Sequence, residues 1–371
     1  MKISIVTSPF CELPPDAIGA VERLWADMAG EFARQGHSIE LLGKRGKTVL
    51  PSERNLKRTY IRGYGRAKSV YFDIILDFFY SFRALGRMGV CDVLVCNTFW
   101  TPILAPLFFR RKFKRLVYNV ERFPKIQLKM YRRVDLFACA STPVRAELIR
   151  LVPSFENRAR VIPNPINIDV FNASVRPDSH GELRIGYHGR IHVEKGIDRL
   201  AEAVSKLSAE FSQIRLRMIG PSEVSRGGSG EAYRRKLDEL SKKRIEWVEA
   251  ISNPEMLAAS LRECLIYCYP SVAEKGETFG VSPLEAMGLG LPVVVSKLEC
   301  FADFAKNGVN ALVFNHRAND ATDQLVHQLR RLLLDAKLRD SLSERAYATT
   351  RRFSTTVVAS NYLLAFEELV N

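Results

Sequence analysis

Glu277 and Glu285 are two carboxylates separated by seven residues, in a segment that also carries Gly276, Gly280 and Gly288. Residues 265–271 before them are apolar and end at a Pro-Ser pair, which is typical of a buried strand that stops there. Residues 293–296 predict a second strand. The order strand, glycine loop, helix, turn and strand predicts a βαβ unit with polar groups at its carboxyl edge.

This edge could bind a ligand with two different chemical parts. A loop followed by a helix N-terminus can present backbone N–H groups to a phosphate. The two carboxylates would repel a second anion, so the group that they hold should be neutral and rich in hydroxyls. A nucleotide-sugar meets both requirements.

The elements that must position these residues are predicted to form two domains. The chain has 371 residues, 47% apolar and 26% charged, as a soluble globular protein does. Strand and helix patterns alternate in both halves, which predicts an α/β protein of two Rossmann-like domains facing each other across a cleft. A Pro- and Asn-rich stretch after residue 162 marks the boundary. We therefore assign residues 1–165 to an N-terminal domain, 166–350 to a C-terminal domain and 351–371 to a C-terminal helix.

The composition also predicts the compartment in which the protein works. No apolar run reaches the roughly 18 residues of a membrane-spanning helix, and residues 2–7 predict a first strand instead of a leader segment. The seven cysteines are scattered and odd in number, which favours reduced thiols in a cytosolic protein.

Positive charge is concentrated in the first half. Residues 1–180 hold 29 Lys and Arg against 16 Asp and Glu, a net +13 of the total +14. This asymmetry indicates an anionic partner, although a solvated basic surface is the simpler alternative. Basic clusters at 54–68 and 110–115 flank an apolar helix, for which we favour packing on a sheet over a membrane-surface role. That helix presents Tyr71, Phe72, Ile75, Leu76, Phe79, Phe82 and Leu85 on one broad face.

Four motifs, three of them in the second half, resemble those of one enzyme family. They are the Glu277–Glu285 pair within Glu-x-Phe-Gly…Glu-Ala-Met, Gly189-Arg190 before Lys195-Gly196, Ile162-Pro163-Asn164, and Tyr269-Pro270-Ser271. In their order along the chain they resemble the retaining GT-B glycosyltransferases of family 4, also called glycosyl transferases group 1. The resemblance covers nearly the whole chain and is looser in the first half. It implies an acceptor-binding first domain, a nucleotide-sugar-binding second domain, and a C-terminal helix that returns to the first.

The resemblance also implies roles for single residues. Arg190 and Lys195 would bind the donor diphosphate and stabilise the charge that develops as the sugar–phosphate bond breaks. Glu277 would hold hydroxyls of the donor sugar, which makes Arg190, Lys195 and Glu277 the expected catalytic set. Glu285 would hold the ribose. Further donor-binding positions would be Gly19, Gly189, Phe279, Gly280 and Val281, mainly through their backbones.

The first half departs from the family pattern in two places. Relatives carry paired glycines where this chain has Gly19 alone, and many carry a His where this chain has Asn119 and Glu121. We assign these last two residues to the acceptor side. For His188 and His192, beside Arg190, a donor contact and a structural role are equally compatible with the sequence. No Asp-x-Asp occurs, so we expect no metal and no cofactor other than the nucleotide-sugar donor.

These residues predict a retaining transferase that moves a sugar from a UDP- or GDP-sugar to an anionic lipid-linked or glycan acceptor in polysaccharide or glycoconjugate biosynthesis. It would be cytoplasmic and peripheral at the inner face of the cell membrane, held there by the basic N-terminal domain. A soluble acceptor such as a sugar phosphate is the alternative. Nucleic acid is not expected, because only the pI of about 9.5 favours it. A nicotinamide-linked dehydrogenase would need a Gly-x-Gly-x-x-Gly fingerprint, which neither half has.

Overall fold

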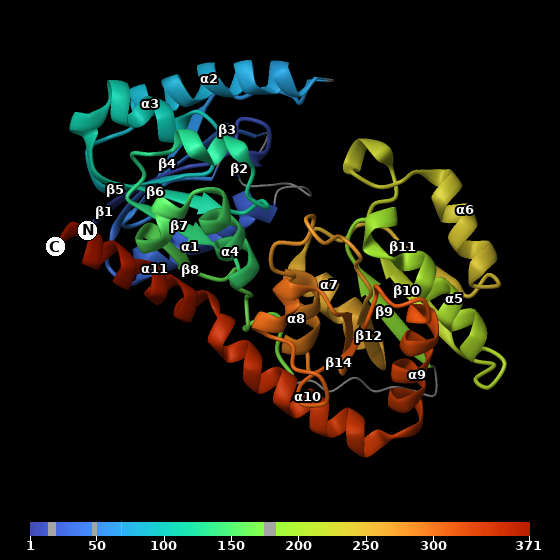
Figure 1. The fold of residues 1–371 in the computed structure, drawn as a ribbon. Coiled ribbons are helices and arrows are strands. Elements are labelled where there is room, and N and C mark those ends of the chain that lie inside the picture. The colour runs from blue at the N-terminus through green and yellow to red at the C-terminus, as the bar shows by residue number, and fades with distance from the viewer. Residues whose placement is uncertain (14–19, 47–49, 68, 174–182) are drawn as a thin grey trace. The chain divides into compact units, whose positions relative to one another are not determined.

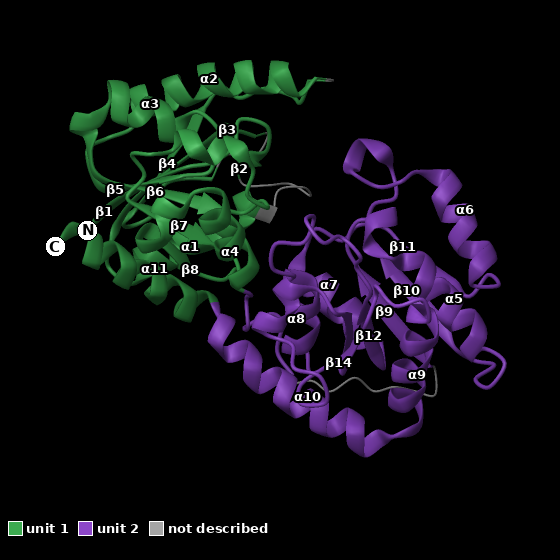
Figure 2. Ribbon diagram, in the orientation of Figure 1, with its two compact units in different colours: residues 1–165, 355–371 green, residues 166–354 purple. Residues whose placement is uncertain are grey.

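The protein divides into two compact units, coloured separately in Figure 2. The structure, a computed structural model, describes residues 1–13, 20–46, 50–67, 69–173 and 183–371. Unit 1 comprises Met1–Pro165 and Thr355–Asn371, and unit 2 comprises Ile166–Ser354. The second division thus falls after residue 354, not after 350 as the sequence suggested. The rings of Phe279 and Phe304 explain the difference, because both pack on Phe353 and keep it in unit 2.

Unit 1 is built on a parallel sheet of eight strands among the described residues (Figure 1). The strand order is β2-β3-β1-β5-β6-β7-β8, and β4 pairs with β3. The strands are β1 (Lys2–Val6), β2 (Glu12–Leu13), β3 (Ser38–Arg45), β4 (Leu56–Ile61), β5 (Cys91–Cys96), β6 (Phe113–Val120), β7 (Leu136–Cys139) and β8 (Ala159–Val161).

Helices cover both faces of this sheet. The α-helices of unit 1 are α1 (Ala20–Arg34), α2 (Val70–Arg87), α3 (Thr101–Phe108), α4 (Thr142–Leu151) and α11 (Thr355–Val370). Three short 3-10 helices accompany them, η1 (Arg110–Lys112), η2 (Ile126–Met130) and η3 (Pro153–Arg158).

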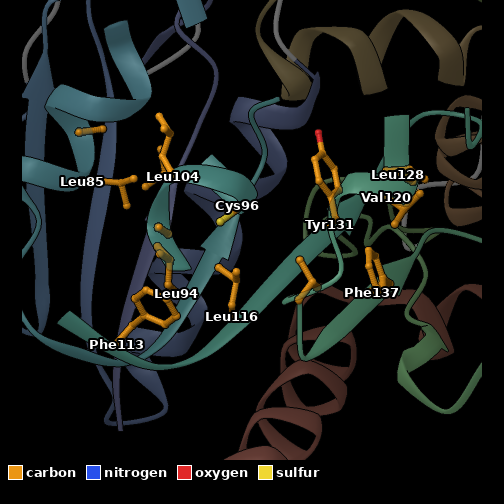
Figure 3. Close-up of a cluster of buried hydrophobic side chains, with 14 of the residues drawn as sticks. Leu85, Leu94, Cys96, Leu104, Phe113, Leu116, Val120, Leu128, Tyr131 and Phe137 are labelled. Atoms are coloured by element: carbon orange, nitrogen blue, oxygen red, sulfur yellow. The ribbon is translucent and has the colours of Figure 1, made fainter. Parts of the chain in front are cut away.

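Alternation along β5 shows how one strand serves two cores. Val93 and Val95 belong to the core under α1 and α11, whereas Leu94 and Cys96 point to the opposite core under α2 and α3. Successive side chains of a strand point to opposite faces, so an apolar run is buried on both. Figure 3 shows the second core, in which side chains of β5, β6 and β7 meet Leu85 of α2 and those of neighbouring segments.

The C-terminal helix α11 completes unit 1. Its Tyr362 and Phe366 rings contact Trp25 and Phe32 of α1, with centroid separations of 5.4 Å for Trp25–Tyr362 and 6.0 Å for Phe32–Phe366. The predicted α/β class, the two Rossmann-like units and the return of the C-terminal helix to the first unit are therefore confirmed.

Helix α2 is only partly the core helix that the sequence favoured. Tyr80, Ala84 and Leu85 are buried, but Tyr71 and Phe72 are 81% and 63% exposed. The sequence favoured burial of the more apolar face, whereas the structure buries the side that also carries Asp77 and Ser81.

Unit 2 has a six-stranded parallel sheet in the order β11-β10-β9-β12-β13-β14. Its strands are β9 (Arg184–His188), β10 (Arg215–Ile219), β11 (Ile245–Val248), β12 (Ile266–Tyr269), β13 (Val293–Ser296) and β14 (Leu312–Phe314). The order reverses between β9 and β12, and such a switch point is where open α/β sheets bind ligands.

The α-helices of unit 2 are α5 (Ile197–Leu207), α6 (Glu231–Leu240), α7 (Pro254–Arg262), α8 (Val281–Gly288), α9 (Ala321–Leu334) and α10 (Ala336–Thr350). Its 3-10 helices are η4 (Val193–Lys195), η5 (Val224–Arg226), η6 (Glu299–Asp303) and η7 (Arg351–Phe353).

Candidate functional site

The loops that leave β9 and β10 touch through two glycines. Gly189 has a φ of 139° and Gly220 a φ of 146°, in a region that side chains rarely adopt. A Cβ on Gly220 would lie 2.0 Å from the Gly189 carbonyl oxygen. Both positions therefore require glycine, and their close approach fixes the start of the loop that carries Arg190.

A second contact joins the loop after β9 to the loop after β12. The Val272 N–H donates to the Glu194 carbonyl oxygen at 3.0 Å. Gly196 is left-handed, with a φ of 61°, and a Cβ there would lie 2.3 Å from the Pro270 carbonyl oxygen. The glycine allows the two backbones to approach, which brings Lys195 to the segment that bears Glu277.

Lys195 and Glu277 form a buried ion pair at this junction. The two residues are only 6% and 9% exposed. The Tyr269 hydroxyl donates to the same Glu277 oxygen at 2.9 Å, and the Lys195 ammonium lies 5.6 Å from the centre of the Tyr269 ring. Burial and the neighbouring Glu277 carboxylate hold the pKa of Tyr269 well above its usual value, so its hydroxyl stays protonated and donates.

Arg190 is the accessible cation of the site. Its guanidinium donates to Glu194 Oε1 at 2.7 Å and to the Gly227 carbonyl oxygen at 3.0 Å, and 44% of its side chain is exposed. One predicted cation is thus buried and paired, whereas the other is held at the surface of unit 2 where an anion could reach it.

The second glutamate is held by a histidine. His188, at the end of β9, places Nε2 at 2.8 Å from Glu285 Oε2, and its Nδ1 is buried with no partner among the described residues. Glu285 lies on α8, whose Leu284, Ala286 and Met287 are fully buried, so this helix is largely enclosed. His188 thus contacts a predicted donor-binding residue, and its role in donor binding stays a prediction.

Helix α8 begins at the predicted backbone segment. Gly280 precedes it with a φ of 102°, and a Cβ there would meet the Phe301 ring at 2.5 Å. The Phe279 ring is buried against Phe304 and Phe353, so this side chain belongs to the core. What the segment offers to a ligand is the backbone at residues 279–281.

The predicted acceptor-side residues lie together in unit 1. Asn119 Nδ2 donates to Glu121 Oε1 at 2.7 Å, and Asn164 Nδ2 donates to Glu121 Oε2 at 3.0 Å. The Tyr362 hydroxyl of α11 donates to Asn119 Oδ1 at 3.2 Å. Burial raises the pKa of the Glu121 carboxyl in spite of the two amide donors. Gly19, the remaining predicted residue, lies outside the described residues.

Sequence reasoning missed three partners of the predicted residues. They are Tyr269, which donates to Glu277, Glu194, which binds Arg190, and Gly220, which meets Gly189. Tyr269 belongs to one of the four motifs, and its place at the carboxyl end of a buried strand could have indicated the contact with Glu277. In the part of the chain that the structure describes, no group of three or more His, Cys, Asp or Glu is placed to hold a metal ion.

Two family models match successive parts of the chain. The model of glycosyl transferases group 1 matches residues 173–349, and that of glycosyltransferase family 4 matches residues 19–170. The chain is 29% identical over 218 residues to a phosphatidyl-myo-inositol mannosyltransferase of Mycobacterium leprae, covering 56% of this chain and 52% of the relative. It is 32% identical over 190 residues to a D-inositol 3-phosphate glycosyltransferase of Corynebacterium jeikeium, covering 50% and 43%. The chain thus spans about half the length of the curated relatives that it matches.

The fold extends the similarity to the whole chain. The solved structure of Anabaena HepE in complex with UDP and glucose covers 99% of both chains with a TM-score of 0.74 at 16% identity. The motif order, the two matched models and this fold agree on a single assignment. The chain belongs to the GT-B glycosyltransferases of family 4, group 1.

Proposed function

We propose that this protein is a retaining glycosyltransferase that moves a sugar from a nucleotide-sugar to a lipid-linked or glycan acceptor. The observation that carries the proposal is the meeting of two loops at the switch point of unit 2. One loop brings Lys195 and the other brings Glu277, with Arg190 exposed beside them. The proposal therefore takes Arg190 and Lys195 as the cations for a diphosphate and Glu277 as the carboxylate for sugar hydroxyls.

The proposed chemistry follows from these charges. As the bond between the anomeric carbon and the diphosphate breaks, negative charge develops on the leaving oxygen, and Arg190 and Lys195 stabilise it as it forms. The acceptor hydroxyl attacks the same face of the sugar and passes its proton to the leaving phosphate. Glu277 orients the sugar, while Glu285, held by His188, binds the ribose. With two cations at the diphosphate, we expect transfer without a metal ion.

The acceptor is proposed from charge and from the name of one relative. The net +13 of residues 1–180 favours an anionic acceptor or an anionic membrane surface at the cytoplasmic face. The Mycobacterium leprae relative is named for phosphatidyl-myo-inositol, which is a lipid. The Corynebacterium jeikeium relative is named for inositol 3-phosphate, and it supports the second candidate, a soluble phosphorylated acceptor.

The test is sugar transfer and donor hydrolysis by the purified chain, with a panel of UDP- and GDP-sugars. Arg190→Ala, Lys195→Ala and Glu277→Ala should each lower kcat/KM by about a hundredfold, the usual loss when one group that stabilises the transition state is removed. Arg330→Ala is the matched control, because it removes an exposed arginine of the same unit that is paired with Glu210 at 2.7 Å. Full activity of all three site variants would overturn the assignment.

A further inference from the structure

Helix α2 carries an apolar face that the described residues of unit 1 leave largely exposed. Tyr71, Phe72, Ile75, Phe79 and Phe82 are 81%, 63%, 50%, 52% and 45% exposed. At about 100° per residue, these five side chains fall within one sector of about 100°. The buried Asp77, Tyr80 and Ala84 lie on the opposite side of the helix. The most apolar face of a helix normally packs on the core, but in α2 that face is exposed and the buried side includes Asp77 and Ser81.

The exposed face continues onto α3. The Phe82 ring lies 6.3 Å from the Phe108 ring and 5.3 Å from the Phe109 ring. Leu107 and Phe108 are themselves 57% and 65% exposed. Single exposed apolar residues are ordinary on protein surfaces, but a contiguous set marks a binding surface. We call this set the α2–α3 apolar face, which consists of Tyr71, Phe72, Ile75, Phe79, Phe82, Leu107 and Phe108.

Cations lie beside the α3 end of this face, and the acids of α2 avoid it. Arg110 and Arg111, which follow α3, are exposed, and the exposed Arg133 donates to the Pro106 carbonyl oxygen of α3 at 3.2 Å. Asp77 is buried, and Asp73 accepts from the Ala67 N–H at 2.7 Å on the side away from the exposed rings. Residues 70–133 contain 12 Lys and Arg against 4 Asp and Glu.

We propose that the α2–α3 apolar face inserts into the interfacial layer of an anionic lipid membrane. Aromatic and aliphatic side chains flanked by Lys and Arg are what such a layer binds, because it combines apolar chains with negative headgroups. The charge favours a membrane over a second copy of the chain as the partner of this face, because two copies would bring positive surfaces together and repel each other. Among the described residues no helix is long and apolar enough to cross a membrane.

This inference deepens the proposed function, on which it rests for its link to a lipid-linked acceptor. A transferase whose acceptor lies in the membrane gains from docking there, because the acceptor then meets it in two dimensions. The surface itself can be tested without any transfer reaction.

The experiment is flotation of the full chain with vesicles of phosphatidylcholine, alone and mixed with phosphatidylglycerol, at low and high salt. The chain should float with the mixed vesicles at low salt, and Phe72→Ser/Phe79→Ser should lower the bound fraction by about tenfold. Val224→Ser/Met256→Ser is the matched control, because it removes two apolar side chains of unit 2 that are 73% and 63% exposed. The control should float as the wild type does.

Three results would overturn the inference. One is a wild-type chain that stays with the unbound fraction in mixed vesicles at low salt. Another is equal flotation of the Phe72→Ser/Phe79→Ser variant. The third is a wild-type chain that sediments as a dimer and does not float, together with a variant that sediments as a monomer. This result would assign the face to a second copy. Hydrolysis of a soluble nucleotide-sugar, measured on the same samples, separates the two proposals. A wild-type chain that floats but hydrolyses no nucleotide-sugar would contradict the proposed function and leave the membrane-binding face intact.

Discussion

The ammonium group of Lys195 and the carboxylate of Glu277 form an ion pair that is more than nine-tenths buried in unit 2. The two residues are 82 positions apart, and the contact exists because their loops leave neighbouring strands at the switch point. Taking two charges out of water is costly, so a buried pair of this kind adds little net stability. Its presence is better explained by a ligand that both groups serve.

Removing only one partner of this pair should destabilise the fold. Lys195→Met leaves Glu277 buried without its cation, which costs about 3–5 kcal/mol of the free energy of unfolding. Lys195→Met/Glu277→Leu should recover most of that loss, because no charge then remains buried. Urea unfolding measures the stability of the single and the double variant. A free energy of unfolding of Lys195→Met within about 1 kcal/mol of the wild-type value would contradict this expectation. Transfer activity should be lost in both, which separates folding from function.

The bond between His188 and Glu285 should affect donor binding more than the chemical step. His188→Ala removes the group that orients Glu285, and we expect the KM for donor to rise about three- to tenfold, the usual worth of one hydrogen bond. The kcat should stay within about twofold. His188→Gln can still donate to Glu285 and should restore much of the affinity. A fall in kcat at constant KM would assign His188 a different role.

Gly220 should tolerate no side chain. Gly220→Ala would place a Cβ against the Gly189 carbonyl oxygen in addition to its strained φ, and should cost more than about 2 kcal/mol of folding free energy. Gly308→Ala is the matched control, because Gly308 also has a positive φ, of 70°, but nothing within 4 Å of an added Cβ. Its cost should be about 1 kcal/mol, that of the left-handed conformation alone. Thermal unfolding of the two variants tests this. An equal loss of stability in both would show that the backbone at Gly189 moves to make room for the added Cβ.

Stability should depend on pH through Asp77. Burial raises the pKa of this carboxyl from 3.8 to about 6, although it accepts hydrogen bonds from the Phe99 and Trp100 N–H groups and from the Ser81 hydroxyl. Because the folded pKa is above the unfolded one, the carboxyl's contribution to stability is present below pH 4 and is lost as pH rises through about 6.

Asp77→Asn should remove this dependence. The amide oxygen can accept from the two backbone N–H groups, and its nitrogen can donate to Ser81. Relative to wild type, the variant should gain about 2–3 kcal/mol between pH 4 and pH 7. Urea unfolding at the two pH values measures the difference. If the free energies of unfolding of the two proteins differ by the same amount at pH 4 and at pH 7, ionisation of Asp77 does not destabilise the fold.

The sequence predicted the parts of the site that depend on topology. Glycine loops after buried strands place Arg190, Lys195 and Glu277 at one sheet edge, because carboxyl ends of parallel strands share that edge. It did not predict that Lys195 and Glu277 bind each other, since that contact depends on the left-handed turn at Gly196 and the hydrogen bond from Val272 to Glu194. It also could not predict which side of α2 is exposed, because packing and not residue type decides that.

The central claim is that unit 2 binds the diphosphate of a nucleotide-sugar through Arg190. Titration of the wild-type chain and of Arg190→Ala with UDP and with GDP, followed by the shift in unfolding temperature, tests it most directly. One nucleotide should raise the unfolding temperature of the wild type with the logarithm of its concentration. Arg190→Ala should need at least about tenfold more of it for the same shift, whereas Arg330→Ala should behave as wild type. No shift with either nucleotide, or an equal shift in Arg190→Ala, would contradict the claim.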